Sequence, residues 1–435
     1  MLTKISNFIC RKIQRLISLT VFPNSPTSRW LINFYLAEIK NRVSSFETSQ
    51  NLGWLLTPSH PFARKVASQF MSLDQNHLGN WSINGVELWS TRQLEKNVID
   101  AMVDLYQAAN QKLEGYFTSG STEGNIYAAW QGRNYLQTFC PNSKIDVIGT
   151  DLSHYSIKKA ANLLNLPFIV SPLNDSDWNL DPNGLYQTLE QRYKKGQRGF
   201  LVSLTMGYTQ TGTSDKIEPI LKIIRKLRKN YPETHFYVWI DAALLGFVLP
   251  FIENFTPFES TEIGALVVDF HKFAQVPYPA GGVFYRSKFR KYIEQDISYL
   301  PNKDNTLLGS RPGYTVAATW AMIQLQGKAG FSKIVKQQLE HKAYFLKKLL
   351  ENFPKTEIIS AENSLTCGLI FHDLPNQSIS KATGDKYGFF AKPIYLNFAK
   401  TGRRLVKMYK IYFLPHSNIK AIDCCLAELA SEKKS

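Results

Sequence analysis

Residues 236–243 read Phe236-Tyr-Val-Trp-Ile-Asp-Ala-Ala243, which is five apolar residues followed by a carboxylate and two small residues. A short apolar run of this kind is typical of a strand buried on both faces of a sheet. If the sheet is parallel, Asp241 lies at its carboxyl edge, where open α/β sheets bind their ligands. The plain alternative is an Asp that caps the following segment.

Similar apolar runs lie on both sides of this stretch. The candidate strands are Ile145–Ile148, Phe168–Ser171, Phe200–Leu204, Phe236–Ile240, Ala265–Val268 and Val283–Tyr285. Helical spacing predicts helices between them over Ser156–Leu164, Pro182–Lys195 and Ile217–Asn230. This alternation predicts an α/β domain whose mostly parallel sheet is covered by helices on both faces.

The segments outside this region predict further parts. Apolar spacing predicts helices over Glu95–Gln111 and Ile126–Phe139, and a long helix over Val316–Leu350 with a break near Gly327–Gly330. The tail mixes short strands with turns and ends in a helix over Asn418–Glu432, as in a small α+β domain. We therefore expect an N-terminal segment over 1–95, a large domain over 96–315, and a linking helix with a small domain over 316–435.

The composition is that of a globular protein with a substantial core. Hydrophobic residues make up 44% and charged residues 20% of the 435 residues, which excludes a disordered chain. No apolar run approaches the roughly 18 residues that span a bilayer, so an integral membrane protein is excluded. The five cysteines show no zinc-binding spacing, so we expect no metal site. We expect reduced thiols and a cytoplasmic location.

The net charge is strongly positive. It is +16, from 51 Lys and Arg against 35 Asp and Glu. Such an excess fits a nucleic acid, an anionic membrane or an acidic ligand as a partner. No basic run is interleaved with aromatic residues, so we do not expect nucleic acid. A generally basic, solvated surface is the favoured interpretation.

The first 25 residues carry much of the local positive charge. Lys4, Arg11, Lys12 and Arg15 alternate with short apolar stretches. The run Leu16–Phe22 is short and is not followed by a small-residue cleavage pattern, which argues against a signal peptide. We expect a partly ordered arm, with a helix on a membrane surface or on a neighbouring subunit as alternatives.

A Gly/Ser/Thr segment precedes the predicted helix that begins near Ile126. It reads Thr118-Ser-Gly-Ser-Thr122, and its N–H groups and hydroxyls could hold a phosphate at the positive end of a helix. The alternative is an ordinary helix start capped by Ser121 or Thr122. Alone, this motif does not indicate a ligand.

Two further residues follow predicted strands. Lys272, in His271-Lys272, comes shortly after Ala265–Val268, and a desolvated Lys there is a nucleophile for carbonyl groups. His154 follows Ile145–Ile148 in the same way. A surface Lys and a structural His are the alternatives. A phosphate cradle, an aromatic ring, an acid and a Lys at one sheet edge are what pyridoxal phosphate (PLP) needs.

Taken together, the motifs resemble the group II PLP-dependent amino-acid decarboxylases, and within them the histidine/serine decarboxylase branch. The resemblance runs from about Leu73 to the last helix. The matching segments, in chain order, are Asn76–Asn80, Ser90–Glu95, Thr118–Asn125, Ser153–Ala160, Asp241–Ala243, His271-Lys272, Tyr299–Arg311 and Leu414–His416.

The resemblance implies an aspartate-aminotransferase-like fold (PLP fold type I) with a mostly parallel seven-stranded sheet and a small C-terminal domain. It implies a homodimer in which the N-terminal segment packs on the partner subunit. Lys272 would carry the cofactor as a Schiff base, His154 would stack on its ring, and Asp241 would bind its ring nitrogen. A mobile loop would bring Tyr299 to the site. Further implied cofactor contacts are Ser119, Gly120, Ser121, Thr122, Thr209, Ala243, His271 and, from across the dimer interface, Ser310.

The implied reaction is α-decarboxylation of an L-amino acid, with histidine as the first candidate substrate and serine or an aromatic amino acid after it. A sphingosine-phosphate-lyase-like enzyme is an alternative, because those enzymes share the pattern of Asp269-Phe-His-Lys272. A binding protein without chemistry is another. Residues Asn80, Tyr208, Phe270 and Pro312 depart from the branch pattern, and we expect them near the substrate.

Overall fold

The structure is a computed structural model, and it describes residues 26–44, 50–74, 76–81, 91–298 and 303–433. The chain divides into two compact units, residues 1–48 and 49–435. The first contains helix α2 (Arg29–Ser44), on which the rings of Trp30 and Phe34 stack. All elements below belong to the second unit. None of the helices among the described residues is long and apolar enough to cross a bilayer.

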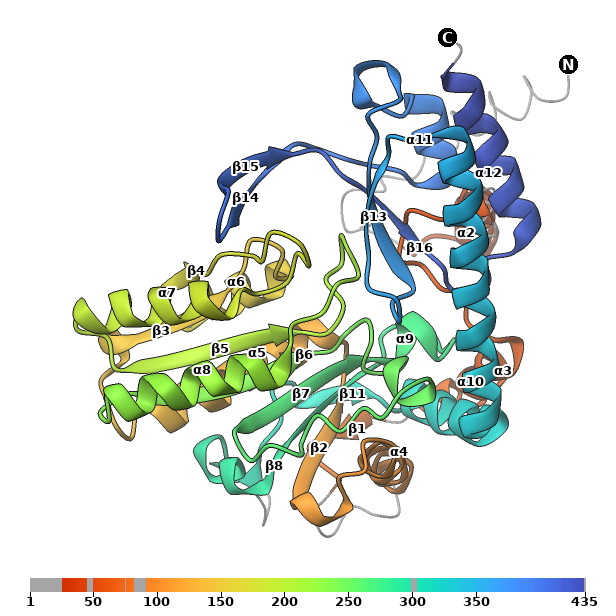
Figure 1. The fold of residues 1–435 in the computed structure, drawn as a ribbon. Helices are drawn as coiled ribbons and strands as arrows, with labels where there is room; N and C mark the ends of the chain where they lie inside the picture. The colour runs from red at the N-terminus through yellow and green to blue at the C-terminus, as the bar shows by residue number, and fades with distance from the viewer. Residues whose placement is uncertain (1–25, 45–49, 75, 82–90, 299–302, 434–435) are drawn as a thin grey trace, which may run out of the picture. The chain divides into compact units, whose positions relative to one another are not determined.

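A seven-stranded sheet forms the centre of the second unit (Figure 1). In spatial order its strands are β2 (Leu113–Thr118), β8 (Gly281–Arg286), β7 (Ile263–Asp269), β6 (His235–Asp241), β5 (Gly199–Thr205), β3 (Ile145–Gly149) and β4 (Phe168–Val170). Strand β8 pairs antiparallel with both β2 and β7, and the other neighbours pair in parallel. The prediction of a mostly parallel sheet is confirmed.

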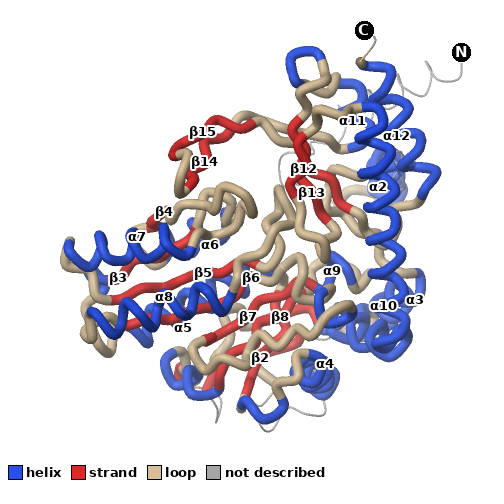
Figure 2. Tube along the Cα trace, viewed as in Figure 1, coloured by secondary structure: helices blue, strands red, loops and turns tan. Residues whose placement is uncertain are grey.

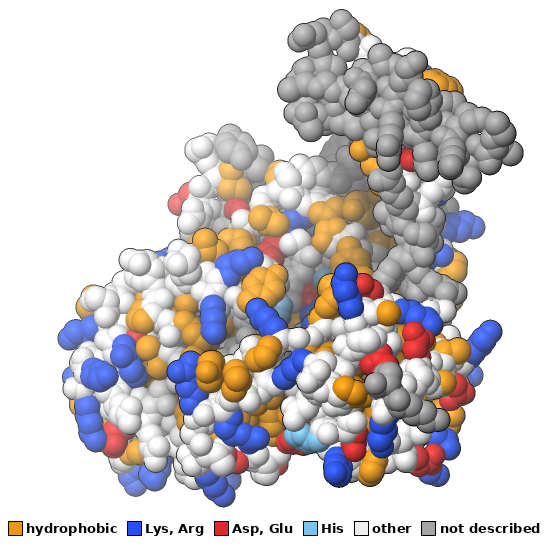
Figure 3. Space-filling model, turned by 90° about the horizontal axis from the view of Figure 1, so that it is seen from above, with side chains coloured by type: hydrophobic (Ala, Val, Ile, Leu, Met, Phe, Trp, Pro, Cys, Tyr) orange, Lys and Arg blue, Asp and Glu red, His pale blue; other side chains and the backbone are white. Residues whose placement is uncertain are grey.

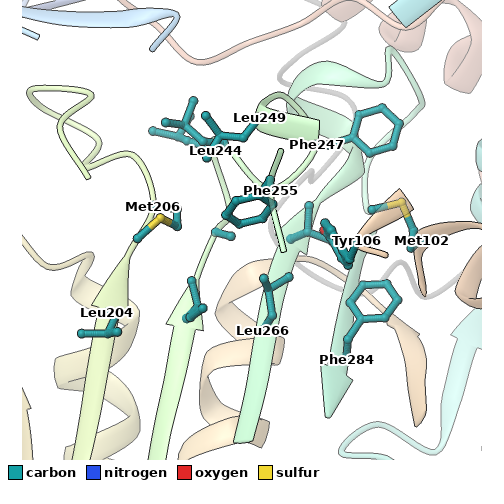
Figure 4. Packing of buried hydrophobic residues seen from close by; sticks show 14 of the residues in the cluster. Met102, Tyr106, Leu204, Met206, Leu244, Phe247, Leu249, Phe255, Leu266 and Phe284 are labelled. Carbon is teal, nitrogen blue, oxygen red and sulfur yellow. The ribbon is translucent and has the colours of Figure 1, made fainter. Parts of the chain in front are cut away.

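Helices cover both faces of this sheet. The core on one face includes side chains from α4 (Arg92–Leu105), α7 (Pro182–Lys194) and α8 (Ile217–Asn230). The core on the other face includes side chains from α5 (Ser121–Leu136) and α6 (Tyr155–Leu163). In the first core, Tyr106 packs edge-on against Phe255 and Phe284, with ring centroids 5.9 and 5.7 Å away (Figure 4). Both faces are buried, which explains why the strands are apolar throughout.

Three local predictions differ from the structure. The predicted helix Glu95–Gln111 is helical only to Leu105, because Gln107 has a φ of 53° and a short 3₁₀ turn, Ala109–Gln111, follows. Helix α5 begins at Ser121, ahead of the predicted Ile126, directly after Gly120 with a φ of 142°. Strand β2 was not among the candidate strands.

The C-terminal part is built around one long helix. Helix α10 (Gly313–Asn352) is interrupted at Gly327, whose φ is 56°, which confirms the predicted break. Beyond it lie an antiparallel sheet, a hairpin and two helices (Figure 2). These are β12 (Glu357–Ile359), β13 (Thr366–Ile370) and β16 (Tyr409–Tyr412), then β14 (Ile394–Phe398) and β15 (Gly402–Val406), then α11 (Lys381–Tyr387) and α12 (Ile419–Glu432).

Short elements complete the unit. They are α3 (Pro61–Met71), α9 (Phe270–Phe273), the pair β1 (Asn76–Leu78) and β11 (Ser310–Pro312), the pair β9 (Gln295–Asp296) and β10 (Lys303–Asp304), and the 3₁₀ turns Asn142–Lys144, Leu249–Phe251, Ser287–Tyr292 and Pro375–Gln377. The domain boundaries at 95 and 315 stay a prediction.

The positive charge is dispersed on the face drawn in Figure 3. Lys and Arg side chains are scattered there among neutral and apolar ones rather than gathered in one patch. This distribution is consistent with a generally basic surface.

Candidate active site

The topology brings the ends of several elements together at the carboxyl edge of the sheet. Asp241 ends β6, and Asp269 ends the neighbouring strand β7. Lys272 lies in α9, directly after β7. The Gly120-Ser121 start of α5 touches Asp269, and His154 is the N-cap residue of α6. Carboxyl ends of parallel strands are the usual ligand site of such sheets.

Asp241 is a buried carboxylate with few partners. Its side chain accepts a hydrogen bond from Asn125 Nδ2 at 3.0 Å and one from the Ala243 N–H at 3.2 Å. Among the described residues, no cation lies within 4.0 Å of it. Burial raises its pKa, and the positive charges of His154 and Lys272 oppose that shift. A buried carboxylate that forms no ion pair within the chain is suited to bind a cationic group of a ligand.

Lys272 is held by a neighbouring carboxylate. Its Nζ lies 2.7 Å from Asp269 Oδ2, and only 13% of the lysine side chain is exposed. Asp269 also accepts from the N–H of Ser121 at 2.6 Å and from its Oγ at 2.7 Å. Burial opposes the charge of Asp269, but Lys272, His271 and the hydrogen bonds together lower its pKa. Asp269 therefore joins the lysine to the start of α5.

The segment predicted to hold a phosphate forms the tight turn into α5. A Cβ at Gly120 would lie 3.2 Å from His271 Cε1 and 3.4 Å from Asp269 Oδ1, so the loop passes close to α9. The N–H of Ser119 donates to Glu123 Oε2 at 2.6 Å, as that of Ser121 does to Asp269. Both N–H groups thus bond to carboxylates of the chain itself. Phosphate contact through Ser119, Gly120, Ser121 and the half-buried Thr122 stays a proposal.

His154 caps α6 with its own ring. Nδ1 lies 2.8 Å from Ser156 Oγ and 3.3 Å from the Ser156 N–H. The ring also contacts Tyr155, with centroids 4.3 Å apart. Burial lowers the pKa of His154; Asp241 opposes this shift and Lys272 adds to it. His154, Asp241 and Lys272 thus influence one another electrostatically.

The remaining predicted residues lie in differing surroundings. The buried ring of His271 packs on Tyr278 with centroids 4.3 Å apart, and its Nδ1 accepts from the Ala280 N–H at 3.3 Å. Thr209 is half-buried, and its carbonyl accepts from Tyr412 Oη at 3.0 Å. Ala243 is half-buried next to Asp241.

Two predicted residues are not brought to this edge by any described contact. Ser310 is exposed on β11, and its Oγ accepts from Asn76 Nδ2 at 3.0 Å. Tyr299 lies outside the described residues. The predicted roles of both residues stay untested.

Two of the sequence departures are core residues, and the expectation that they lie near the substrate stays a prediction. Tyr208 is fully buried, its Oη donates to Asp215 at 2.9 Å, and Thr150 Oγ1 donates to that Oη at 3.2 Å. Phe270 is fully buried and stacks on Phe117 with centroids 5.5 Å apart.

The other two departures are also placed by the fold. Asn80 is buried, with 1% of its surface exposed. Pro312 ends β11 and is the N-cap residue of α10, where the lack of an N–H costs nothing.

Four residues that were not predicted as site residues belong to the same cluster. Asn125, Ser156, Asp269 and Glu123 bind the predicted residues directly. Glu123, Asn125 and Ser156 stand inside segments that match the family pattern, and Asp269 stands in the Asp269–Lys272 pattern shared with the sphingosine phosphate lyases. Their polar side chains were not distinguished from ordinary helix and turn residues.

The residues present fit pyridoxal phosphate. A protonated pyridine nitrogen supplies the cation that the buried Asp241 lacks among the described residues. Lys272 offers an amine beside it, and the imidazole of His154 offers an aromatic face. The fold and these side chains define a PLP-dependent enzyme of fold type I.

Comparison with known proteins shows to which family of fold-type-I PLP enzymes the chain belongs. The sequence model of the pyridoxal-dependent decarboxylase conserved domain matches residues 82–372. The chain therefore belongs to the pyridoxal-dependent decarboxylase family. It is a PLP-dependent amino-acid decarboxylase, a carboxy-lyase.

Individual relatives differ in substrate. A probable L-tyrosine/L-aspartate decarboxylase of Methanococcus maripaludis is 27% identical over 411 residues, which cover 92% of this chain and 97% of that protein. A histidine decarboxylase of Vibrio campbellii is 28% identical over 296 residues, which cover 67% of this chain and 72% of that protein. An L-methionine decarboxylase structure from Streptomyces sp. 590 has a TM-score of 0.80 at 18% identity and covers 95% of this chain and 98% of its own, which shows the shared fold.

Proposed function

We propose that the chain decarboxylates an L-amino acid with a planar side chain, histidine first, and releases CO₂ and the corresponding amine. The observation that carries this proposal is the buried Asp241, which forms no ion pair among the described residues but is influenced electrostatically by both His154 and Lys272. The motifs of the histidine/serine branch and the histidine decarboxylase relative support histidine. The tyrosine/aspartate relatives make those two amino acids the next candidates.

The proposed roles follow from the chemistry of the side chains. When bound, PLP supplies a conjugated ring that accepts the electron pair left by the departing carboxylate. Lys272 binds the cofactor through its amine, and the charge of Asp241 keeps the ring nitrogen protonated. His154 covers the ring. Tyr299 delivers a proton to the substrate carbon. The loop Ser119–Thr122, together with Thr209, Ala243 and His271, holds the remainder of the cofactor.

We further propose a cytoplasmic homodimer in which Ser310 of one chain reaches the cofactor of the other. The exposure of Ser310 supports this, because its hydroxyl is open to a second molecule. The free thiols of Cys140, Cys367, Cys424 and Cys425 are in keeping with a reducing compartment. The domain boundaries at residues 95 and 315 belong to the same proposal.

The test is product identification by mass spectrometry after incubation of the PLP-loaded protein with each of the twenty amino acids. We expect the amine of histidine as the main product. Tyramine or β-alanine as the main product would transfer the preference to tyrosine or aspartate. Cleavage of a phosphorylated amino alcohol without CO₂ release from any amino acid would favour the lyase alternative and contradict the proposal.

Lys272→Ala is the matched variant for the cofactor role. We expect it to lose the visible absorbance of bound PLP, because the amine that binds the cofactor is gone. Lys229→Ala, at an exposed position near the end of α8, is the control and should keep the wild-type spectrum. A wild-type spectrum in Lys272→Ala would contradict the assignment.

A further inference from the structure

The amide of Asn125 joins two of the proposed cofactor contacts. This fully buried side chain donates from Nδ2 to Asp241 Oδ2 and to Ser156 Oγ, both at 3.0 Å. Its Oδ1 accepts from Trp239 Nε1 at 3.1 Å. An indole nitrogen can only donate, so the amide oxygen must face Trp239. The NH₂ group therefore faces Asp241 and Ser156, and the amide cannot be flipped.

The fixed orientation of the Asn125 amide determines how the Ser156 hydroxyl bonds to His154. Because its Oγ receives a hydrogen from Asn125, its own hydroxyl proton is free to point at His154 Nδ1, 2.8 Å away. The N–H of Ser156 is directed at the same nitrogen at 3.3 Å, and a backbone N–H can only donate. Both donors require a lone pair on Nδ1. A neutral imidazole then carries its proton on Nε2.

Burial and the surrounding charged groups together lower the pKa of His154. Asp241 of β6 and Asp269 of β7 favour the protonated ring, whereas Lys272 of α9 and Lys159 of α6 oppose it. Burial is the largest influence and lowers the pKa of His154. The neutral ring is therefore the form on which the Ser156 contacts act.

We infer that Ser156 is a positioning residue that holds His154 in one tautomer, with its proton on Nε2, and that Asn125 is a positioning residue that connects Ser156 to Asp241 by hydrogen bonds. Nε2 bonds to no other described residue and is thus left as a donor. An N–H donor at this position can bind a substrate carboxylate, which a bare ring nitrogen would repel. The inference rests on the proposed function, which places His154 and Asp241 at the cofactor.

The direct test is nitrogen NMR of the cofactor-free full-length chain with ¹⁵N-labelled histidine rings, recorded at neutral pH. The His154 signals are assigned by their loss in His154→Gln. We expect one bare nitrogen and one protonated nitrogen, with the proton coupled to Nε2. A wild-type ring protonated at Nδ1 overturns the inference. Since no activity is measured, this result is independent of whether the substrate proposal holds.

Ser156→Ala tests the serine by removing the hydroxyl donor. We expect a mixture of the two tautomers, because only the longer contact from the Ser156 backbone N–H then remains at Nδ1. We also expect a fall in kcat/KM of about fivefold or more, which is the value of one hydrogen bond. Ser153→Ala is the matched control: it removes a hydroxyl in the same loop, and that hydroxyl accepts from the Thr150 N–H at 2.9 Å. It should keep one tautomer. An unchanged tautomer in Ser156→Ala overturns the role of Ser156. If that variant does not fold, the wild-type NMR spectrum still tests whether the His154 proton lies on Nε2.

Asn125→Leu separates the two ends of the chain of hydrogen bonds. Leu has a similar shape but cannot donate to Asp241 or Ser156. The Ser156 hydroxyl can still donate to His154, so we expect one tautomer as in the wild type. Asp241 loses a donor that stabilises its charge, so we expect weaker PLP retention in an absorbance titration. Wild-type PLP retention in this variant overturns the role of Asn125.

Discussion

Tyr208, which its place in the motif predicts to lie near the substrate, is in the structure a buried partner of Asp215. Its hydroxyl donates to the buried carboxylate of Asp215, which also accepts from the N–H groups of Leu180 and Thr205. Burial raises the pKa of Asp215 to about 6, and these hydrogen bonds limit the rise. Burying the ionised carboxylate of Asp215 therefore costs free energy, which its hydrogen-bond donors offset. The neutral carboxyl group needs fewer of these donors.

This dependence gives a pH-sensitive prediction for Tyr208→Phe. The raised pKa of Asp215 makes its contribution to stability greatest below its unfolded value near 4, and that contribution is lost as pH rises through about 6. Above pH 6 the charged carboxylate needs the Tyr208 hydroxyl. We expect Tyr208→Phe to lower the free energy of unfolding by about 1.5–3 kcal/mol at pH 7.5 and by less at pH 5. Urea unfolding at the two pH values measures this.

Tyr193→Phe is the control for that comparison. The Tyr193 hydroxyl bonds to the exposed Glu233, whose pKa is lowered chiefly by that hydrogen bond. Glu233 is charged at both pH values, so the effect should be small and equal at both. An equal loss of stability for Tyr208→Phe at pH 5 and pH 7.5 would show that Asp215 does not titrate in this range.

At the scale of single residues, the sequence predicts which side chains can take part in the chemistry better than it predicts which neighbours surround them. Lys272, Asp241 and His154 stand out because few residue types can do what PLP needs, and the fold brings them together. The role of Asn125 was not predictable, because its partners lie 31 and 116 positions away in the sequence. The burial of Tyr208 was missed for a different reason: Asp215 is only seven positions away, but its burial is visible only in three dimensions.

The hairpin β14–β15 is hydrogen-bonded to the loop that leads to His154. Asp151 Oδ2 accepts from the backbone N–H of Asn397 at 2.9 Å and from its Nδ2 at 2.6 Å. Further along the hairpin, Asp175 accepts from Lys400 and Thr401. Asp151 lies three residues before His154, so the first contact acts on the loop that places the imidazole.

We predict that Asn397→Ala loosens this loop. Loss of the side-chain donor to Asp151 should speed amide hydrogen exchange in residues 150–156 as well as in 394–406, because local opening becomes easier. Thr401→Ala removes a contact at the other end of the hairpin and should speed exchange near 399–403 only. Exchange measured by mass spectrometry distinguishes the two. Unchanged exchange in residues 150–156 in Asn397→Ala would show that the hairpin does not hold the loop.

Elements with strong apolar runs were predicted well, and so was the mostly parallel pairing of the sheet, except for the direction of β8. All six candidate strands are present, because a strand buried on both faces must be apolar along its whole length. Strand β2 was missed because Glu114 and Gly115 interrupt its apolar run. The reversed direction of β8 was not predictable, since hydrophobicity is the same for parallel and antiparallel pairing. The break of α10 was predictable because only Gly readily takes the φ found at Gly327.

At the scale of the whole molecule, the net charge of +16 says less about possible partners than the surface around Ser310 does. The charge is scattered where Figure 3 shows it. In contrast, Ser310 lines a hollow of about 420 Å³ together with Phe70, Met71, Arg311 and Tyr314. An exposed hydroxyl beside apolar side chains is suited to a surface that a second copy of the chain covers, as the proposed homodimer requires.

Subunit complementation tests that proposal, because two differently damaged chains can form one intact site. Lys272→Ala lacks the lysine, and Ser310→Asp places a negative charge against the cofactor phosphate while leaving the exposed position foldable. Each variant alone should be inactive. In a twofold-symmetric dimer, a refolded equimolar mixture should recover about a quarter of wild-type activity, since half of the dimers are mixed and each has one intact site of two. Full PLP binding by Ser310→Asp alone would place Ser310 away from every cofactor. Inactivity of the mixture, despite mixed dimers seen by native mass spectrometry, would place both residues in the site of a single chain.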